Sequence, residues 1–306
     1  MKIVGVNISH DVSVCLLDNG KLKKFYHEDR LQKVKHLPAT VDFNNFLSLN
    51  SFVNQNIDLI AYSGVTHPAA NPELKSIKNK IHNKFNCDSF YDDSKHHLYH
   101  ALNGFYLSNF NEAMCIVVDG GGAKPTKWPY QEIESIFYVN KNCYVTYFQN
   151  CSNLPSIPIK NCFIYSDLES KQIINGVEYQ FTSRAMGGIS FEIASNLVGF
   201  NSSDAGKLMG LSSYAHSKNK YNLNYEHVKL ANEIQKENFE RTCELINKAY
   251  KYRKLKNIIL SGGVALNCVN NYKYVQKFKN LNFFVDPNPN DSGTSLGVAL
   301  YCNGYN

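Results

Sequence analysis

Several features that would place this protein in a special class are missing from its sequence. No run of about 18 apolar residues occurs, so we expect no membrane-spanning helix. The first six residues already have the pattern of a strand, so we expect no signal peptide. The nine cysteines are spread out without a Cys-x-x-Cys pair, which favours reduced thiols in a cytoplasm over a disulfide framework.

What is present is typical of a soluble globular protein. The chain has 306 residues, of which 43% are hydrophobic and 19% charged, and it is rich in tyrosine and phenylalanine. This length is enough for one large bilobed domain or two ordinary ones. The net charge of +6 is mild: it fits phosphorylated ligands and permits nucleic acid without requiring it.

The two halves of the chain begin in a similar way. Strands are predicted at 2–6, 12–17 and 21–27, with a hairpin turn at Asp18-Asn19-Gly20. The second half starts with a strand at 113–118, a polar turn, and strands at 135–139 and 144–149. We interpret this as a weak internal repeat of two strand-rich lobes, 1–112 and 113–306.

The remaining elements alternate between strands and helices. Strands are expected at 58–62, 257–261 and 281–285, and the basic segment 75–84 is expected to be a solvated helix face. Helices are expected at 41–54, 185–199, 204–212, 226–251, from 264 to about 277, and at 294–302.

A helix rich in histidine is the most informative stretch. It is expected to start near Asp92-Asp93-Ser94, and His96 and His100 then lie one turn apart, on the side opposite the apolar stripe. Two imidazoles at this spacing can bind one zinc, iron, copper or nickel ion. An ordinary surface helix with scattered histidines explains an arbitrary pair of this kind more often.

Asp291 is a candidate third ligand. It lies between a strand and the last helix, in Pro289-Asn290-Asp291-Ser292-Gly293, where a helix cap is the simpler explanation. Together with His96 and His100 it would complete a set of two histidines and one carboxylate that leaves positions open for substrate.

Two glycine-rich turns follow strands. Asp119-Gly120-Gly121-Gly122 suits a phosphate-facing turn whose Asp can hold a metal or water, although a plain hairpin is an equal alternative. Gly262-Gly263 joins a strand to a helix, which can present flat backbone to a planar ligand or serve only close packing.

A polar cluster near the N-terminus offers groups for acid–base chemistry. His10 ends the first strand and is a candidate general base. Arg30 and Lys35 follow the third strand and could hold a phosphate or carbonyl oxygen, whereas a solvated charged loop is the default for such a run.

Taken together, these motifs resemble the O-carbamoyltransferases of nodulation-factor, cephamycin and aminoglycoside biosynthesis. The matching motifs, in order, are Gly5-Val6-Asn7 with His10-Asp11; Glu28, Arg30, Lys35 and His36; His96-His97-Leu98-Tyr99-His100-Ala101; Val118 to Gly122; Gly206-Lys207-Leu208-Met209-Gly210-Leu211; Gly262 to Cys268; and Asn288 to Gly293, where the proline is shifted. Seven ordered motifs cover nearly the whole chain.

The resemblance implies an α/β fold of the actin/Hsp70/sugar-kinase (ASKHA) type, with two ribonuclease-H-like lobes and a ligand cleft between them. It implies that His96, His100 and Asp291 bind a divalent metal, iron above all, with magnesium, manganese or zinc as alternatives. The residues implied to line the nucleotide are Asp119, Gly120, Gly121, Lys207, Gly262, Gly263 and Asn267. His10, Lys35 and Arg30 are then expected to face the carbamoyl group.

The implied reaction moves a carbamoyl group from carbamoyl-adenylate to an acceptor hydroxyl. Family members commonly carry a second domain, similar to threonylcarbamoyl-AMP synthase, that makes the adenylate from carbamoyl phosphate and ATP. That domain is not found in these 306 residues. We therefore expect a separate synthase-like subunit and an active hetero-oligomer.

The acceptor stays open at this point. A hydroxyl of a small natural product is one possibility, and a hydroxymethyl group on a modified pyrimidine of DNA is another, because 248–256 is basic and could meet phosphates. A tRNA threonylcarbamoyl transferase is a rival, although Asp119-Gly-Gly-Gly stands where Ser-Gly-Gly-His would be expected. A second rival interpretation is a non-enzymatic, nucleotide-dependent regulator on the same fold.

Overall fold

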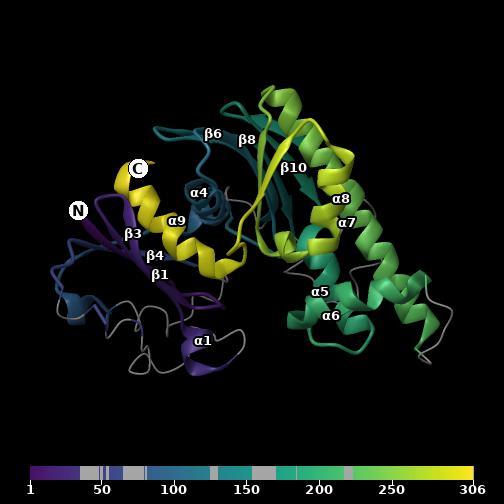
Figure 1. The fold of residues 1–306 in the computed structure, drawn as a ribbon, viewed down its shortest axis with the longest axis horizontal. Helices are drawn as coiled ribbons and strands as arrows, with labels where there is room; N and C mark the ends of the chain where they lie inside the picture. The colour runs from purple at the N-terminus through teal and green to yellow at the C-terminus, as the bar shows by residue number, and fades with distance from the viewer. Residues whose placement is uncertain are drawn as a thin grey trace.

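The structure, a computed structural model, describes residues 1–34, 48, 51–52, 55–64, 79, 81–124, 130–153, 170–183, 185–216 and 223–305. They form two sheets with helices between and around them (Figure 1). Lys35, His36, most of the expected helix 41–54 and half of the basic segment 75–84 lie outside the described residues.

The first sheet has five strands in the order β3-β2-β1-β4-β5. They are β1 (Lys2–Asn7), β2 (Ser13–Asp18), β3 (Lys21–His27), β4 (Leu59–Ser63) and β5 (Asp88–Tyr91). The first three strands are antiparallel, whereas β1, β4 and β5 run parallel. The turn after β2 has positive φ at both Asn19 and Gly20, as expected for a two-residue hairpin.

The second sheet has seven strands in the order β12-β11-β6-β7-β8-β10-β9. They are β6 (Glu112–Val118), β7 (Gln131–Asn140), β8 (Tyr144–Ser152), β9 (Ser170–Ile174), β10 (Val177–Thr182), β11 (Asn257–Ser261) and β12 (Asn282–Val285). Its β8-β7-β6-β11-β12 portion has the strand directions of the first sheet, three antiparallel and then three parallel. The internal repeat expected from the sequence is therefore visible in the topology.

The helices form a middle layer and an outer layer. Helices α4 (His96–Ser108) and α9 (Thr294–Leu300) lie between the sheets, and α7 (Tyr225–Tyr252) and α8 (Cys268–Lys277) cover the far face of the second sheet (Figure 1). Helices α5 (Gly187–Leu197) and α6 (Ala205–Ser212) lie at one end of α7, and the short α1 (Glu28–Gln32) follows β3.

Alternating side chains on the central strands pack on both sides of the sheets. On β6, Cys115 and Val117 pack toward α4, whereas Met114 and Ile116 pack toward α7. Helix α9 comes from the end of the chain yet packs on β1, β2 and β4 of the first sheet. The lobe boundary at 112/113 stays a prediction, although every strand of the first sheet ends before it and every strand of the second begins at or after Glu112.

Helix α4 is buried on all sides over most of its length. Residues 96–105 are all buried, including the polar side expected to face away from the core. The surface-helix interpretation of the histidines is therefore wrong. Buried polar side chains require partners, and these define the site described below.

Among the described helices, none is both long enough and apolar enough to cross a bilayer. The longest, α7, spans 28 residues but is polar along the side that faces away from the sheet.

Candidate metal centre

Two imidazoles from α4 meet at the centre of the molecule. Asp92 accepts a hydrogen bond from the backbone N–H of Ser94 at 2.9 Å, which starts a short 3-10 turn leading into α4. His96 and His100 then follow one turn apart with no exposed surface. Their Nε2 atoms lie 3.1 Å apart, so both rings point at the same spot.

Two carboxylates approach that spot from opposite ends of the chain. Asp119 follows β6, and Asp291 opens the 3-10 turn before α9. His96 Nε2 lies 3.4 Å from Asp119 Oδ2 and 3.4 Å from Asp291 Oδ1. His100 Nε2 lies 3.7 Å from each of the same two oxygens. The structure thus brings the three predicted metal ligands together and adds Asp119.

The spacing of these atoms fits a shared divalent ion. Ligand atoms about 2.1 Å from one ion lie about 3.0 Å apart at octahedral angles and about 3.4 Å apart at tetrahedral angles. The distances above run from 3.1 to 3.7 Å, from near the octahedral value to slightly beyond the tetrahedral one, and all four ligand atoms lie within 4.8 Å of one another. Two imidazoles and two carboxylates suit iron, manganese or zinc.

His96 and the carboxylates at the centre shift one another's pKa values toward the charged forms. Burial lowers the pKa of His96, but the carboxylates of Asp291 and Asp119 outweigh it and raise that pKa to about 10. Burial raises the pKa of Asp291, but His10 and His96 bring it well below its usual range. The positive charge favoured on His96 thus offsets the two carboxylates, as a bound cation would.

Hydrogen bonds from the first sheet fix the position of Asp291. Ser9 Oγ donates to Asp291 Oδ2 at 2.7 Å, and Thr294 Oγ1 donates to the Asp291 carbonyl oxygen at 2.6 Å. Ser13 Oγ donates to the carbonyl oxygen of Ser292 at 2.6 Å. The end of the chain is thereby tied to β1 and β2, which gives Asp291 a defined orientation.

A second network orients α4. Asn103 Nδ2 donates to both oxygens of Asp286, at 2.9 and 2.8 Å, and Ser261 Oγ donates to Asp286 Oδ2 at 2.7 Å. The three side chains come from α4, the loop after β12 and the end of β11. Helix α4 is therefore held against the strand ends that surround the centre.

His10 lies at the edge of the centre. Its Nδ1 is 2.9 Å from Asp11 Oδ2 and its Nε2 is 3.4 Å from Asp291 Oδ2, while 61% of its side chain is exposed. The charge of Asp291 is the main cause that raises the pKa of His10 to about 10. Asn7 shapes this loop because its amide donates to the carbonyl oxygens of His10 and Asp11.

The Gly262-Gly263 turn is joined directly to the metal centre. Asp119 Oδ1 accepts a hydrogen bond from the N–H of Gly263 at 2.9 Å. Gly262 has φ +84°, and a Cβ there would lie 2.3 Å from the Val118 carbonyl oxygen, so only glycine fits. Asp119 can thus connect a ligand bound at the glycine turn with an ion held by the histidines.

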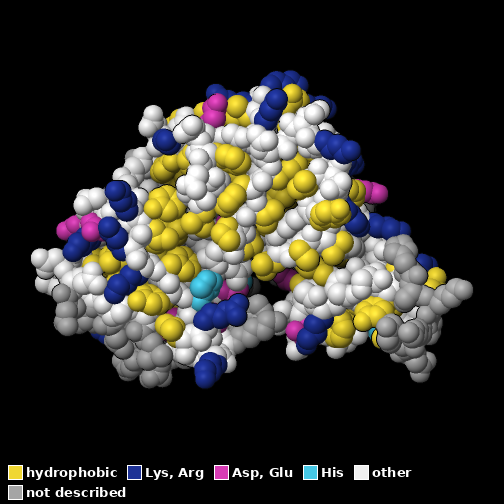
Figure 2. All heavy atoms as spheres, viewed as in Figure 1, with side chains coloured by type: hydrophobic (Ala, Val, Ile, Leu, Met, Phe, Trp, Pro, Cys, Tyr) yellow, Lys and Arg dark blue, Asp and Glu magenta, His cyan; other side chains and the backbone are white. Residues whose placement is uncertain are grey.

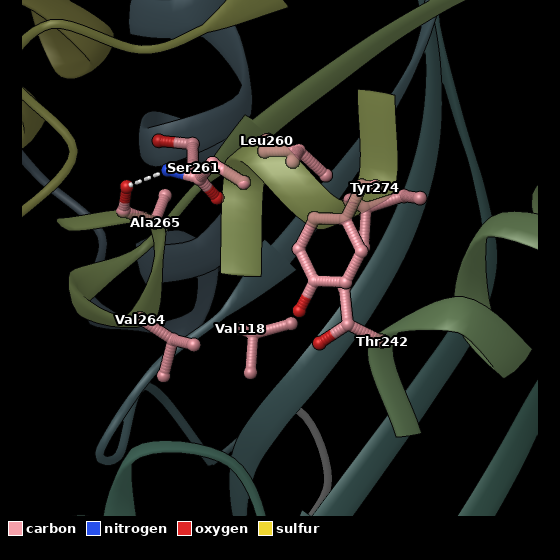
Figure 3. Close-up of a pocket in the computed structure, with 9 residues that line it drawn as sticks. Val118, Thr242, Leu260, Ser261, Val264, Ala265 and Tyr274 are labelled. Carbon is pink, nitrogen blue, oxygen red and sulfur yellow. Dashed lines mark hydrogen bonds between the residues drawn. The ribbon is translucent and has the colours of Figure 1, made fainter. Parts of the chain in front are cut away.

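A small pocket lies beside this turn (Figure 3). Its volume is about 10 Å³, the size of one water. Its walls come from β6, α7, β11 and α8, and the hydroxyl groups of Tyr274 and Thr242 point toward each other across it (Figure 3).

Asn267 has a structural role beside this pocket. Its amide exchanges two hydrogen bonds with Gln235, at 2.9 and 3.0 Å, and its oxygen caps α8. Its contact with a nucleotide stays a prediction, since the buried side chain already has these partners.

The other expected site residues lie in different settings. Gly120 and Gly121 are in the turn after Asp119, partly exposed. Lys207 is exposed on α6, pairs with Asp204 at 2.9 Å and lies over the ring of Phe200. Arg30 is exposed on α1. Their roles stay predictions.

The structure also shows site residues that the sequence did not single out, namely Ser9 and Glu192. A Cβ on Gly120 would lie 2.2 Å from Glu192 Oε1, which places this carboxylate against the glycine turn. Ser9 lies within the Gly5 to Asp11 motif without being one of its matched positions, and Glu192 lies in none of the matched motifs.

The surface is hollowed between the part built on the first sheet and the part that carries α5 and α6 (Figure 2). The metal centre and the glycine turns lie at the carboxyl ends of the parallel strands β1, β6 and β11. Ligands of open α/β sheets bind at such strand ends.

Solved structures share this fold. The chain resembles full-length HypF in its phosphate- and nucleotide-bound form with a TM-score of 0.62 and 15% identity, over 99% of this chain and 55% of that one. A putative N-acetylmannosamine kinase from Listeria monocytogenes has a TM-score of 0.50 at 11% identity, over 99% of both chains. The fold is therefore of the ASKHA type, as expected.

Curated proteins match over nearly the whole chain. An uncharacterized protein of Methanocaldococcus jannaschii is 24% identical over 97% of this chain and 56% of its own length. The nodulation protein NolNO of Sinorhizobium fredii is 21% identical over 95% of this chain and 46% of its own length. The chain thus spans about half the length of these relatives.

The family comparison matches the end of the chain. Residues 226–300, which include α7, the Gly262-Gly263 turn and Asp291, match the family model "Carbamoyltransferase N-terminus". The resemblance to the carbamoyltransferase family that the sequence motifs indicated is thereby confirmed.

Proposed function

We propose that this chain transfers a carbamoyl group from carbamoyl-adenylate to the hydroxyl of an acceptor. The observation that carries the proposal is the hydrogen bond between Asp119 and Gly263, because it joins the His96/His100/Asp291 cluster to the glycine turn. A nucleotide at that turn would have its phosphate close to the cluster.

A divalent metal held by His96, His100, Asp119 and Asp291 would supply positive charge next to the departing phosphate. In the transfer, the acceptor oxygen forms a bond to the carbamoyl carbon, and the bond from that carbon to the phosphate oxygen breaks. AMP leaves with the electron pair, and the acceptor proton passes to a base.

His10 is the base in this proposal. It is exposed at the edge of the cluster, and its pKa is raised chiefly by the charge of Asp291. A cation bound to Asp291 would offset the negative charge that raises the pKa of His10. The pKa of His10 would then fall, and its neutral ring could accept a proton. Ser9 donates to the same oxygen of Asp291 and keeps the carboxylate oriented.

The direct test is AMP release from synthetic carbamoyl-adenylate. The metal-loaded protein should release AMP faster when hydroxyl acceptors are present and should form the carbamate of the acceptor. The His100→Asn variant is expected to lose this activity, whereas Lys229→Gln on the exposed side of α7 should keep it. Equal AMP release with and without the protein, across an acceptor panel, would refute the function.

The donor is proposed to come from a synthase-like unit, and the resulting enzyme is proposed to be a hetero-oligomer. The longer relatives support this because the matched part is about half of their length. With carbamoyl phosphate and ATP in place of carbamoyl-adenylate, these 306 residues should form no product until the unit is added. Product formation without the synthase-like unit would contradict the proposed hetero-oligomer but not the proposed carbamoyl transfer.

A small-molecule acceptor is favoured over DNA. Lys248 pairs with Glu178 at 2.6 Å and lies over the Phe148 ring, and Arg253 lies 3.7 Å over the Tyr138 ring. These cations of the basic segment are thus already used in packing. Salt-dependent binding of hydroxymethylated DNA at low ionic strength would reverse this preference.

A further inference from the structure

A second cavity lies on the side of α4 away from the metal centre. It has a volume of about 160 Å³ and lies between the start of α4 and strands β7, β8 and β10. Leu98 lines it, whereas His96 and His100 face the metal centre. Residues two apart on a helix point about 200° apart, so the cavity is separate from the cluster.

The cavity has a buried floor and an open mouth. Glu132 and Gln149 are 1% and 6% exposed at its floor, beside the apolar side chains of Leu98 and Phe137. Lys95, Tyr144, Thr146 and Tyr179 line it closer to solvent and are partly exposed. A ligand can therefore enter from outside and reach a buried carboxylate.

The floor is held rigidly. Glu132 Oε1 accepts hydrogen bonds from the N–H groups of His97, at 2.9 Å, and Ala123, at 3.1 Å. Gln149 Nε2 donates to Glu132 Oε2 at 2.7 Å. The carboxylate and amide are thus fixed side by side, with lone pairs and one amide oxygen left for a ligand.

The chemistry of the lining defines the kind of ligand. A carboxylate next to an amide can accept from and donate to neighbouring hydroxyl groups, and tyrosine rings can pack against C–H faces. Lys95 pairs with Asp92, so the mouth presents no uncompensated positive charge. A cavity of about 150 Å³ is large enough for one six-membered ring.

We propose that this cavity is a binding site for a neutral, polyhydroxylated six-membered ring, such as a monosaccharide or a cyclitol. The proposal does not depend on carbamoyl transfer, because the site is on the other side of α4. The N–H of Glu132 also donates to the carbonyl oxygen of Ala123 at 2.8 Å, which ties the floor of the cavity to the turn after Asp119.

Binding is tested by ligand-observed NMR with myo-inositol, methyl α-glucoside, methyl β-galactoside and N-acetylglucosamine. Cyclohexanol serves as a ring of similar size with one hydroxyl. At least one polyol should bind. Cyclohexanol should bind at least about tenfold more weakly, because its single hydroxyl cannot form hydrogen bonds with both Glu132 and Gln149.

Two variants of β8 locate the binding. Thr146→Trp fills the cavity and should weaken polyol binding at least about tenfold, whereas Val145→Trp on the opposite, exposed face should not change it. If Thr146→Trp does not fold, Tyr144→Phe/Tyr179→Phe removes two hydroxyls and should weaken binding instead. Failure of every polyol to bind, equal binding of cyclohexanol, or unchanged binding in the lining variants would overturn the proposal.

Discussion

Asp119 and Asp291 each place a carboxylate oxygen 3.4 Å from the same Nε2 atom of His96. One carboxylate follows the first strand of the second sheet, and the other precedes the helix that returns to the first sheet. The metal centre is therefore built from both sheets and from the helix between them.

Asp119 is expected to be a metal ligand as well as a support for the glycine turn. Asp119→Ala should lower the bound metal as strongly as Asp291→Ala, because each removes one of two carboxylates around the same imidazoles. Elemental analysis of the purified variants measures this. Asp204→Ala, which removes the ion-pair partner of Lys207, is the matched control, and full metal occupancy in Asp119→Ala would restrict the ligands to three residues.

Ser9 is expected to tune the affinity for metal without binding it. Its hydroxyl orients Asp291, and loss of such an orienting hydrogen bond costs about 10–100-fold in metal affinity. Ser9→Ala should therefore bind metal that many times more weakly in a competition titration with a chelator. An affinity equal to that of the wild type would show that Thr294 and the turn alone position the carboxylate.

His10 is expected to act in the transfer and not in assembling the site. His10→Asn should keep its metal content, while the rate of AMP release falls by about 10²–10⁴-fold, the usual contribution of a general base. Rate and metal content are measured on the same preparation. An unchanged rate would exclude His10 as the base, and a loss of metal would make it part of the metal site.

Glu132 is expected to make stability depend on pH. Burial raises its pKa from 4.5 to about 7, so the folded protein holds this proton more tightly than the unfolded chain does. Its contribution to the free energy of unfolding is present in full below pH 4.5 and decreases as the pH rises to about 7.

Glu132→Gln cannot titrate, and Gln149 can turn its amide to keep the hydrogen bond. As the pH rises from 4.5 to about 7, the Glu132→Gln variant should therefore gain stability relative to the wild type, as measured by urea unfolding. Glu244→Gln, whose side chain is 68% exposed, should show no such difference. Parallel stability curves for Glu132→Gln and the wild type would contradict the assignment.

The ion pair between Arg241 and Glu134 is expected to be important for stability. Glu134 is fully buried and receives three hydrogen bonds from the guanidinium, at 2.7–3.0 Å. Arg241→Met should lower the free energy of unfolding by about 3–5 kcal/mol, because it leaves the buried charge of Glu134 without a counter-charge and only Asn150 as a donor.

The ion pair of Asp204 with Lys207, whose side chain is 63% exposed, is the control for this change. Lys207→Met should alter the free energy of unfolding by less than about 1 kcal/mol. Similar effects of the two substitutions in chemical denaturation would show that Glu134 finds other partners when the arginine is absent.

Local patterns in the sequence predicted much of the fold. The apolar run at 257–261 gave the bounds of β11, and the hairpin signal at Asn19-Gly20 gave the β2–β3 turn. Strands β9 and β10 were missed although Asn175-Gly176 is also a hairpin signal. The side chains of β9 are mostly exposed, so the strand carries no apolar pattern.

The metal centre was only partly predictable. The spacing of His96 and His100 is a local property of one helix, and it was sufficient to pair them. The position of Asp119 depends on which strands end side by side, since β6 neighbours β11 only through a crossover. The complete burial of α4 also arises from packing between two sheets, which no single segment reveals.

We propose that His96, His100, Asp119 and Asp291 together hold one divalent ion. An anaerobic titration of metal-free protein with Fe²⁺, carried out on the wild type and on His96→Ala, tests this. We expect about one ion bound per chain for the wild type and none for the variant. The absence of binding by the wild type, or equal binding by His96→Ala, would show that these side chains do not form a metal site.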